Sequence, residues 1–254
     1  MAAATRRSRR ITSFHFPPGK RVAGKYVVQQ RMGGGWQGEV YKLIEDQTGI
    51  ERAAKFFFPH RNVHNRALHF YARKLDKLRH CPIVIQYHTA EAIEYRGRTI
   101  HFLVSEFVEG EQMSAFLARQ PGKRLAPFEA LHVLYALASG MEGIHKANEY
   151  HGDLHPHNII IKRRGIGFEV RLIDMFHWGA PSPANIREDV IDLVHLLYQL
   201  VGGRKWYAYQ REEIKTICCG LKRSLITRKF KTAGALREYL EGMPWNDTPW
   251  TTEA

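Results

Sequence analysis

The chain has 254 residues and a hydrophobic content of 44%, so it can bury substantial cores, and it contains no apolar run long enough for a transmembrane helix or a signal peptide. Its three cysteines, two of them adjacent, exclude a disulfide framework and fit a reducing, cytoplasmic setting. The net charge of +13 favours acidic partners, ATP among them, but no nucleic-acid-binding motif accompanies it, so nucleic acid is not expected as a partner.

The N-terminal stretch is basic, since the first 38 residues contain no acid, and we assign residues 1–25 to an N-terminal extension. Strands are predicted over residues 26–30 and 40–44, and a glycine-rich segment joins them. Its residues Gly33, Gly35 and Gly38 fit G-x-G-x-x-G, and Val40 extends the pattern to G-x-G-x-x-G-x-V. Gly34 lies between Gly33 and Gly35. Because a strand follows the glycines, the pattern favours a hairpin whose backbone N–H groups lie over nucleotide phosphates, with a plain glycine-rich turn as the alternative.

Lys55 follows Ala53 and Ala54 in an otherwise apolar run. A buried lysine needs an anion, and a nucleotide phosphate would supply one, whereas a lysine at a strand edge would reach water instead. Apolar side chains spaced three, four and three apart then predict a helix over residues 63–79: Leu68, Tyr71, Leu75 and Leu78.

The second half of the chain contains a short polar loop between apolar segments. An apolar stripe predicts a helix over residues 130–145, formed by Leu134, Leu137, Met141 and Ile144. The loop His151-Gly-Asp-Leu-His-Pro-His-Asn158 precedes an apolar run that reads as a buried strand. Asp153 is suited to accept the proton of an attacking hydroxyl, and Asn158 to hold a divalent cation. Asp174, after a strand predicted over residues 168–173, suits Mg²⁺ as well, and residues 189–201 are apolar nearly all round, as in a buried helix.

In this order the glycine segment, Lys55, the 151–158 loop and Asp174 resemble the motifs of the protein-kinase-like superfamily, over about residues 26–240. The N-terminal motifs resemble bacterial-type Ser/Thr protein kinases. The resemblance implies an α+β, bilobal fold: a small antiparallel N-lobe sheet with one helix at 26–107, a mainly helical C-lobe at 108–242 with a shortened activation segment, and a tail at 243–254.

The same resemblance implies ATP and Mg²⁺ as cofactors and assigns roles to individual residues. The nucleotide-binding set is Gly33, Gly34, Gly35, Gly38, Val40, Ala53, Lys55 and the hinge residues Glu106 and Val108. Asn158 and Asp174 would hold the metal. Asp153, Lys55 and His155 would be the catalytic residues.

Three departures from the family pattern bear on activity. Tyr71 stands in the place of the helix glutamate that pairs with the strand lysine, and no acid occurs between Arg52 and Lys74. In the loop, Gly152 replaces an arginine and His155 replaces a lysine, which resembles aminoglycoside and choline kinases. Only fourteen residues separate Asp174 from Asp189, so the activation segment is short.

Three functions therefore remain open at the level of sequence. The first is an ATP-dependent, atypical serine/threonine protein kinase whose substrate is a protein, possibly an acidic one. The second is a small-molecule kinase of the aminoglycoside, choline or glycan type. The third is a pseudokinase scaffold that binds nucleotide without turning it over.

Overall fold

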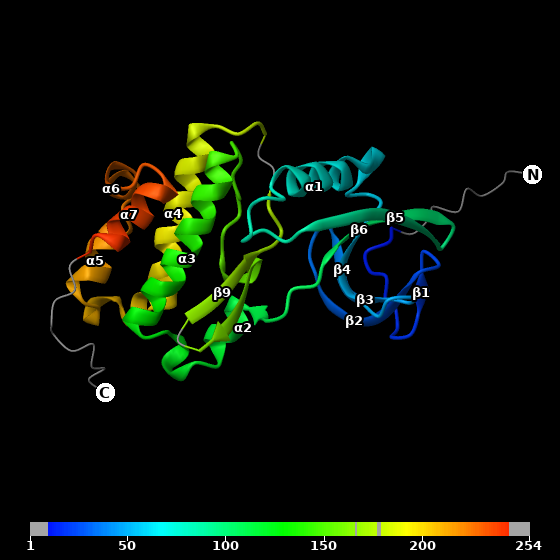
Figure 1. The fold of residues 1–254 in the computed structure, drawn as a ribbon, viewed down its shortest axis with the longest axis horizontal. Coiled ribbons are helices and arrows are strands. Elements are labelled where there is room, and N and C mark those ends of the chain that lie inside the picture. The colour runs from blue at the N-terminus through cyan, green and yellow to red at the C-terminus, as the bar shows by residue number, and fades with distance from the viewer. Residues whose placement is uncertain (1–9, 166, 177–178, 244–254) are drawn as a thin grey trace, which may run out of the picture. The chain divides into compact units, whose positions relative to one another are not determined.

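A computed structural model describes residues 10–165, 167–176 and 179–243 of the chain (Figure 1). The chain forms two compact units, Met1–Arg79 with Ile85–Val108, and His80–Val84 with Glu109–Ala254. The first unit is built on an antiparallel sheet and the second is mainly helical, which confirms the predicted α+β class. Within the described ranges, no helix is both long and apolar enough to cross a membrane. The tail residues 244–254 lie outside the described part of the chain.

The N-terminal unit contains a six-stranded antiparallel sheet of order β1-β2-β3-β4-β6-β5. Its strands are β1 (Arg21–Val22), β2 (Tyr26–Gly34), β3 (Gly38–Glu45), β4 (Glu51–Phe57), β5 (Tyr87–Tyr95) and β6 (Arg98–Glu106). The predicted helix is present as α1 (Arg66–Lys77), preceded by one 3-10 turn, Val63–Asn65. β2 and β3 extend beyond the predicted strands to the edges of the glycine segment, because Gly33 pairs with Val40 and Gly34 with Glu39 in the ladder.

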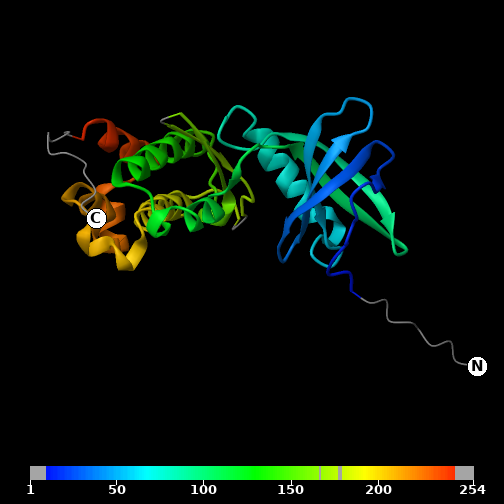
Figure 2. The same ribbon diagram turned by 90° about the horizontal axis from the view of Figure 1, so that it is seen from below.

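The segment before β1 packs on this sheet, a role that the sequence analysis did not anticipate for residues assigned to an extension. Ile11, Phe14 and Phe16 are buried in the core of the sheet, and Figure 2 shows this dark blue segment beside the strands. The Phe16 ring lies 5.0 Å from that of Phe56 and 5.2 Å from that of Tyr41, centroid to centroid. Three apolar residues within six positions, after a run of arginines, are the sequence signal for this burial.

Glu39, directly after the glycine segment, joins the N-terminal segment to β3. Its side chain is only 3% exposed. The carboxylate accepts hydrogen bonds from Ser13 Oγ (2.7 Å), the Phe14 backbone N–H (3.1 Å) and Tyr41 Oη (2.6 Å). Burial acts to raise the pKa of Glu39, but the bonds from Tyr41, Ser13 and Phe14 together hold it below the ordinary 4.5.

Replacing Glu39 with glutamine is expected to lower the free energy of unfolding by about 1–2 kcal/mol, because an NH₂ group would then face these donors. A carboxyl with a lowered pKa stabilises the fold above its unfolded pKa and loses this effect as the pH falls through the folded value. The difference between Glu39→Gln and the wild type should therefore shrink under acid conditions, as measured by urea unfolding at pH values on either side of 4.5. Gln47→Ala on the exposed β3–β4 turn is the control, and a difference that persists unchanged in acid contradicts the assignment.

The C-terminal unit combines six helices with a three-stranded sheet of order β7-β8-β9 among its described residues. Its helices are α2 (Met113–Ala118), α3 (Pro127–Lys146), α4 (Pro183–Leu200), α5 (Glu212–Cys218), α6 (Arg223–Lys229) and α7 (Ala233–Glu241). Its strands are β7 (Glu111–Gln112), β8 (Ile159–Arg164) and β9 (Gly167–Leu172). Short 3-10 turns occupy Pro121–Lys123, Pro156–Asn158, Gly203–Lys205, Tyr207–Tyr209 and Cys219–Leu221.

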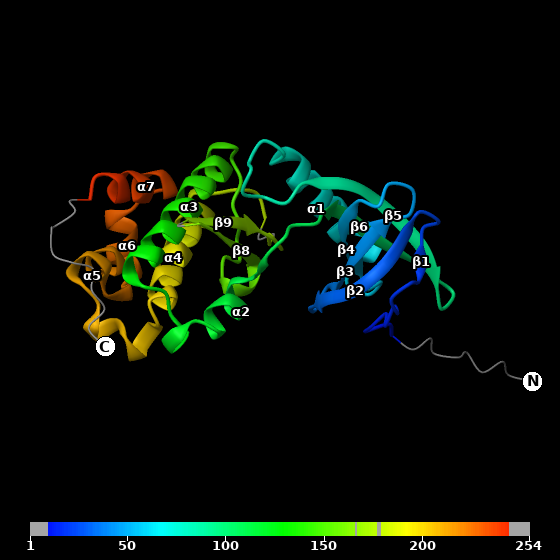
Figure 3. The ribbon, with the colours of Figure 1, turned by 60° about the horizontal axis from the view of Figure 1, so that its bottom comes forward.

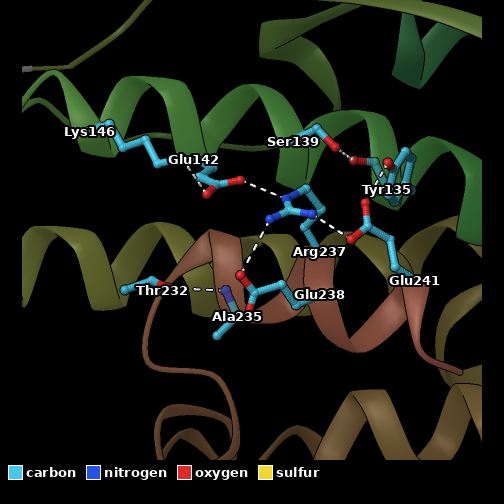
Figure 4. Close-up of polar contacts among 9 residues, drawn as sticks. All are labelled: Tyr135, Ser139, Glu142, Lys146, Thr232, Ala235, Arg237, Glu238 and Glu241. Carbon is cyan, nitrogen blue, oxygen red and sulfur yellow. Dashed lines mark hydrogen bonds and ion pairs between the residues drawn. The ribbon is translucent and has the colours of Figure 1, made fainter.

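α3 and α4 form the centre of this unit and lie side by side (Figure 3). The apolar stripe predicted for α3 is confirmed, since Leu134, Leu137, Met141 and Ile144 are all buried. On the outside of α3, Arg237 of α7 bonds Glu142 through Nε at 2.6 Å and Glu241 through Nη1 at 2.5 Å (Figure 4). Glu241 also accepts a bond from the Tyr135 hydroxyl at 2.8 Å, so polar contacts fasten α7 along α3.

The start of α4 differs from the prediction. α4 begins at Pro183, six residues before the predicted Asp189, because Ser182 caps it by accepting a hydrogen bond from the Asn185 N–H and proline fits the first helical position. Near the C-terminus, α6 and α7 are separate helices, since Thr232 caps α7 by accepting a hydrogen bond from the Ala235 N–H. The early start of α4 shortens the segment after Asp174 still further.

Candidate functional site

One face of the N-terminal sheet gathers the predicted nucleotide-binding residues. Side chains alternate along a strand, so Tyr41 and Phe56 point into the core while Val40, Ala53 and Lys55 point to the opposite face. Val40 of β3 lies opposite Lys55 of β4 in the register. This arrangement places two small apolar side chains and one cation together, as an adenine ring and its phosphates would require.

The glycines of the hairpin differ in whether the surrounding atoms leave room for a side chain. A Cβ on Gly38 would lie 2.0 Å from the Phe56 carbonyl oxygen, so the packing of β3 on β4 alone demands glycine there. A Cβ on Gly33 or Gly35 would meet no atom within 4 Å, and both have negative φ. Neither fold geometry nor packing explains these two glycines, which supports the close approach of a ligand to the hairpin backbone.

Lys55 is held by the hairpin and by α1. Its Nζ donates to Gln37 Oε1 and to the Tyr71 hydroxyl, each at 3.2 Å, and lies 4.3 Å from the centre of the Tyr71 ring. The predicted position of Tyr71 beside the strand lysine is thus present in the structure. Sequence reasoning missed Gln37, for which the only signal was its position between two glycines of the hairpin.

The predicted hinge residues follow the end of β6. Glu106 Oε1 accepts a hydrogen bond from the Gln86 N–H at 2.9 Å, and the Glu106 N–H bonds the Gln86 carbonyl at 3.0 Å. Val108 is the last residue of the N-terminal unit. The Ser105 hydroxyl also donates to the Glu106 carbonyl at 3.3 Å, so bonds from two neighbours fix the conformation of Glu106.

In the C-terminal unit, the loop between α3 and β8 holds Asp153 and Asn158 together. The Asn158 amide nitrogen donates to the Asp153 backbone oxygen at 2.9 Å and to Asp153 Oδ2 at 3.1 Å. Asn158 is 7% exposed, whereas the Asp153 side chain faces solvent. The loop therefore exposes the Asp153 carboxylate to solvent, while the buried Asn158 amide fixes the orientation of that carboxylate. His155 Nε2 lies 3.5 Å from Asp153 Oδ1 and 3.1 Å from the Asn158 amide, so His155 belongs to the same cluster.

Asp174 is tied to this loop through its neighbours. The Ile173 N–H donates to the Asn158 carbonyl at 3.0 Å, and the Phe176 N–H donates to the His151 carbonyl at 2.8 Å. Asp174 itself has a φ of +55°, a left-handed conformation that a non-glycine residue keeps only when its surroundings enforce it. Backbone bonds on both sides of Asp174 provide that enforcement.

The donor set fits a hard divalent cation. The Asn158 amide nitrogen is committed to Asp153, so its Oδ1 is the atom left to face a ligand. Asp174 supplies a carboxylate, and oxygen ligands of these two types suit Mg²⁺ bound jointly with substrate phosphates and water. Within the described ranges, no group of three or more His, Cys, Asp or Glu side chains forms a self-sufficient metal site.

Asp189 of α4 holds the 151–158 loop in place through hydrogen bonds, a role that sequence reasoning missed. It is fully buried and accepts hydrogen bonds from the N–H groups of His151 and Gly152, each at 2.8 Å. Its Oδ2 also lies 3.1 Å from His145 Nε2. The available signal was an aspartate directly before the apolar residues of α4, because a carboxylate buried with them needs hydrogen-bond donors.

Next to this anchor, Gly152, Asn185, Glu188 and Asp192 line a cavity of about 320 Å³. Burial, and after it the charges of Asp189, Glu188 and Asp153, raise the pKa of Asp192 to about 7. An ionised Asp192 therefore costs stability in the folded state.

Replacing Asp192 with asparagine is expected to stabilise the protein at pH 8 and to have little effect near pH 4. Between the unfolded pKa of 3.8 and the folded value of about 7, the native state binds the extra proton, so the free energy of unfolding falls as the pH rises through this window. Thermal unfolding of the variant and wild type across this pH range measures the difference. Glu212→Gln at an exposed site is the control, and a variant whose advantage does not grow with pH contradicts the prediction.

Two features define the class of protein: an antiparallel sheet with a glycine hairpin, and a separate helical unit with Asp153 and Asn158 in one loop and Asp174 after β9. This class is that of proteins with the kinase fold. The sequence model of the protein kinase domain matches residues 26–208, and the chain belongs to that family.

Relatives and solved structures agree with this assignment. The chain is 30% identical over 151 residues to the serine/threonine-protein kinase PrkC of Bacillus subtilis, a match to 58% of this chain and 22% of that protein. It is 31% identical over 156 residues to the serine/threonine-protein kinase pkn2 of Myxococcus xanthus, 59% of this chain and 18% of that protein. The chain thus spans about a fifth of the length of these two relatives. The Mycobacterium tuberculosis PknI kinase domain shares the fold, with a TM-score of 0.64 and 19% identity over 89% of this chain and 97% of that one.

Proposed function

We propose that the chain transfers the γ-phosphate of ATP to serine or threonine hydroxyls of a protein substrate. Asp153 orients the acceptor hydroxyl and takes its proton. Lys55 and the N–H groups around Gly33 and Gly35 bind the phosphates. The observation that carries the proposal is the bonded loop in which Asn158 holds Asp153 while Ile173, next to Asp174, bonds Asn158.

Described residues are suited to bind both the metal and the nucleotide. Asn158 and Asp174 would hold Mg²⁺, which, when bound, neutralises charge on the phosphates. Val40 and Ala53 would face the adenine, and the backbone of Glu106 and Val108 would bond its edge. Binding of one nucleotide by residues of both units is part of the proposal. A cytoplasmic location and an acidic partner remain predictions from composition.

A small-molecule acceptor is the second candidate, and the start of α4 favours it. Because α4 begins at Pro183, few residues follow Asp174 before the helix, too few for a long peptide-binding platform. His155 beside Asp153 adds a possible donor to a phosphate or to a small hydroxyl substrate. Against it stands the likeness of the chain to serine/threonine protein kinases.

The test is incubation of the purified chain with Mg²⁺ and γ-labelled ATP, together with casein and histone in one series and with choline and aminoglycosides in another. Label in protein that requires Asp153 supports the proposal. Label only in the soluble products supports the small-molecule candidate. Nucleotide binding without transfer in either series indicates a pseudokinase and overturns the proposal.

A further inference from the structure

Lys55, Gln37 and Tyr71 are joined by three hydrogen bonds, one between each pair. Lys55 Nζ donates to Gln37 Oε1 and to Tyr71 Oη, each at 3.2 Å, and the Tyr71 hydroxyl donates to Gln37 Oε1 at 3.1 Å. The donors and acceptors balance, since the tyrosine oxygen accepts one bond while its proton makes another, and the amide oxygen accepts two. The set joins the glycine hairpin, β4 and α1.

Gln37 and Tyr71 are each held in place by further contacts. Tyr71 is 8% exposed, and its ring packs against Phe57 with 5.9 Å between ring centres. The Gln37 carbonyl accepts a hydrogen bond from the Phe58 N–H at 2.9 Å, which anchors the backbone from which its side chain reaches inward. Neither side chain can leave Lys55 without a shift of the helix or of the hairpin.

Gln37 and Tyr71 are uncharged, and this decides what these two side chains do to the lysine. A carboxylate at position 71 would orient the ammonium group but would also compete with phosphate for its charge. A phenol and an amide accept hydrogen bonds from the ammonium group without neutralising it, and the Tyr71 ring face adds an attraction that leaves the positive charge in place.

We propose that Gln37 and Tyr71 are positioning residues that hold Lys55 for the nucleotide phosphates, in the role that a helix glutamate would otherwise have. This rests on the proposed function. The hairpin, the lysine and α1 then respond to nucleotide as one unit, and formation of an ion pair with α1 is not required for nucleotide binding.

The test is Tyr71→Phe, which keeps the ring and removes the hydroxyl. The dissociation constant of MgATP is measured by displacement of a fluorescent nucleotide, alongside the thermal midpoint. Tyr71→Phe and Gln37→Leu are each expected to weaken binding about three- to tenfold, because each removes a bond to a charged group. The double variant should bind only slightly more weakly than either single one, since both act on the same lysine.

The matched control is Tyr95→Phe. Tyr95 lies in the same sheet, and its part-buried hydroxyl donates to the Phe14 carbonyl at 2.7 Å. It should leave nucleotide affinity unchanged while lowering the thermal midpoint at least as much as Tyr71→Phe. Unchanged affinity in Tyr71→Phe, or equal losses in both tyrosine variants, overturns the proposal. Because the readout is binding, weakened affinity in a chain that transfers no phosphate would sink the proposed function and leave this inference standing. A wild-type chain that binds no MgATP overturns both.

Discussion

Asp153→Asn is expected to lower the turnover number for phosphoryl transfer by at least about 100-fold, the usual contribution of a positioned general base. The asparagine keeps the size of the side chain, and the Asn158 bond to the backbone oxygen at position 153 does not depend on the carboxylate. The variant loses the group that accepts the proton of the hydroxyl. Its MgATP affinity should stay close to that of the wild type, since phosphate binding is assigned to other residues.

Initial rates at saturating ATP measure the turnover number, and nucleotide displacement measures the affinity. Glu169→Gln, an exposed carboxylate of β9 in the same unit, is the control and should retain full turnover. A turnover number within a few-fold of wild type in Asp153→Asn would show that another group takes the proton, with His155 the nearest candidate at 3.5 Å from Asp153.

Asp189→Ala is expected to lower the free energy of unfolding by about 3–5 kcal/mol, because it leaves buried donors without their acceptor. The N–H groups of His151 and Gly152 each lose a 2.8 Å bond. Both flank Asp153 on its N-terminal side, so phosphoryl transfer should fall with stability. Asp189→Asn keeps one acceptor oxygen and should lie between the alanine variant and the wild type in both measurements.

Urea unfolding followed by tryptophan fluorescence and by circular dichroism gives the stability change. Glu188→Gln is the control, because Glu188 precedes Asp189 but pairs with Arg223 at the surface. A stable Asp189→Ala protein with normal turnover would show that the 151–158 loop holds its shape without a buried acceptor.

Local patterns predicted much of this molecule. The apolar spacing of Leu134 to Ile144 and of residues 189–201 identified two helices, because the period of a helix is written directly into its buried face. The order of the glycine segment, Lys55, Asp153 and Asp174 indicated a kinase, and the match of the protein kinase domain to residues 26–208 confirms that family.

Other features depended on contacts between residues distant in sequence. The segment before β1, rich in Arg, Ser and Thr with three apolar residues, was predicted to be an extension. Phe14 and Phe16 are nevertheless buried, because they pack against aromatic side chains of β3 and β4. The same is true of Glu39, whose burial depends on donors 25 and 26 residues away. The start of α4 was set locally, by Ser182 and Pro183, and was missed because the prediction began only with the apolar pattern at Asp189.

The sequence by itself determined the family and the fold class, and it led to the proposal of which groups do phosphoryl chemistry, because these depend on residue type and order along the chain. Only the tertiary structure decided what holds these groups: Asp189 under the 151–158 loop, and Gln37 with Tyr71 around Lys55. Hydrogen bonds between residues 16 to 38 positions apart have no period and no local signature. They become visible only when the fold has brought donor and acceptor within about 3 Å of one another.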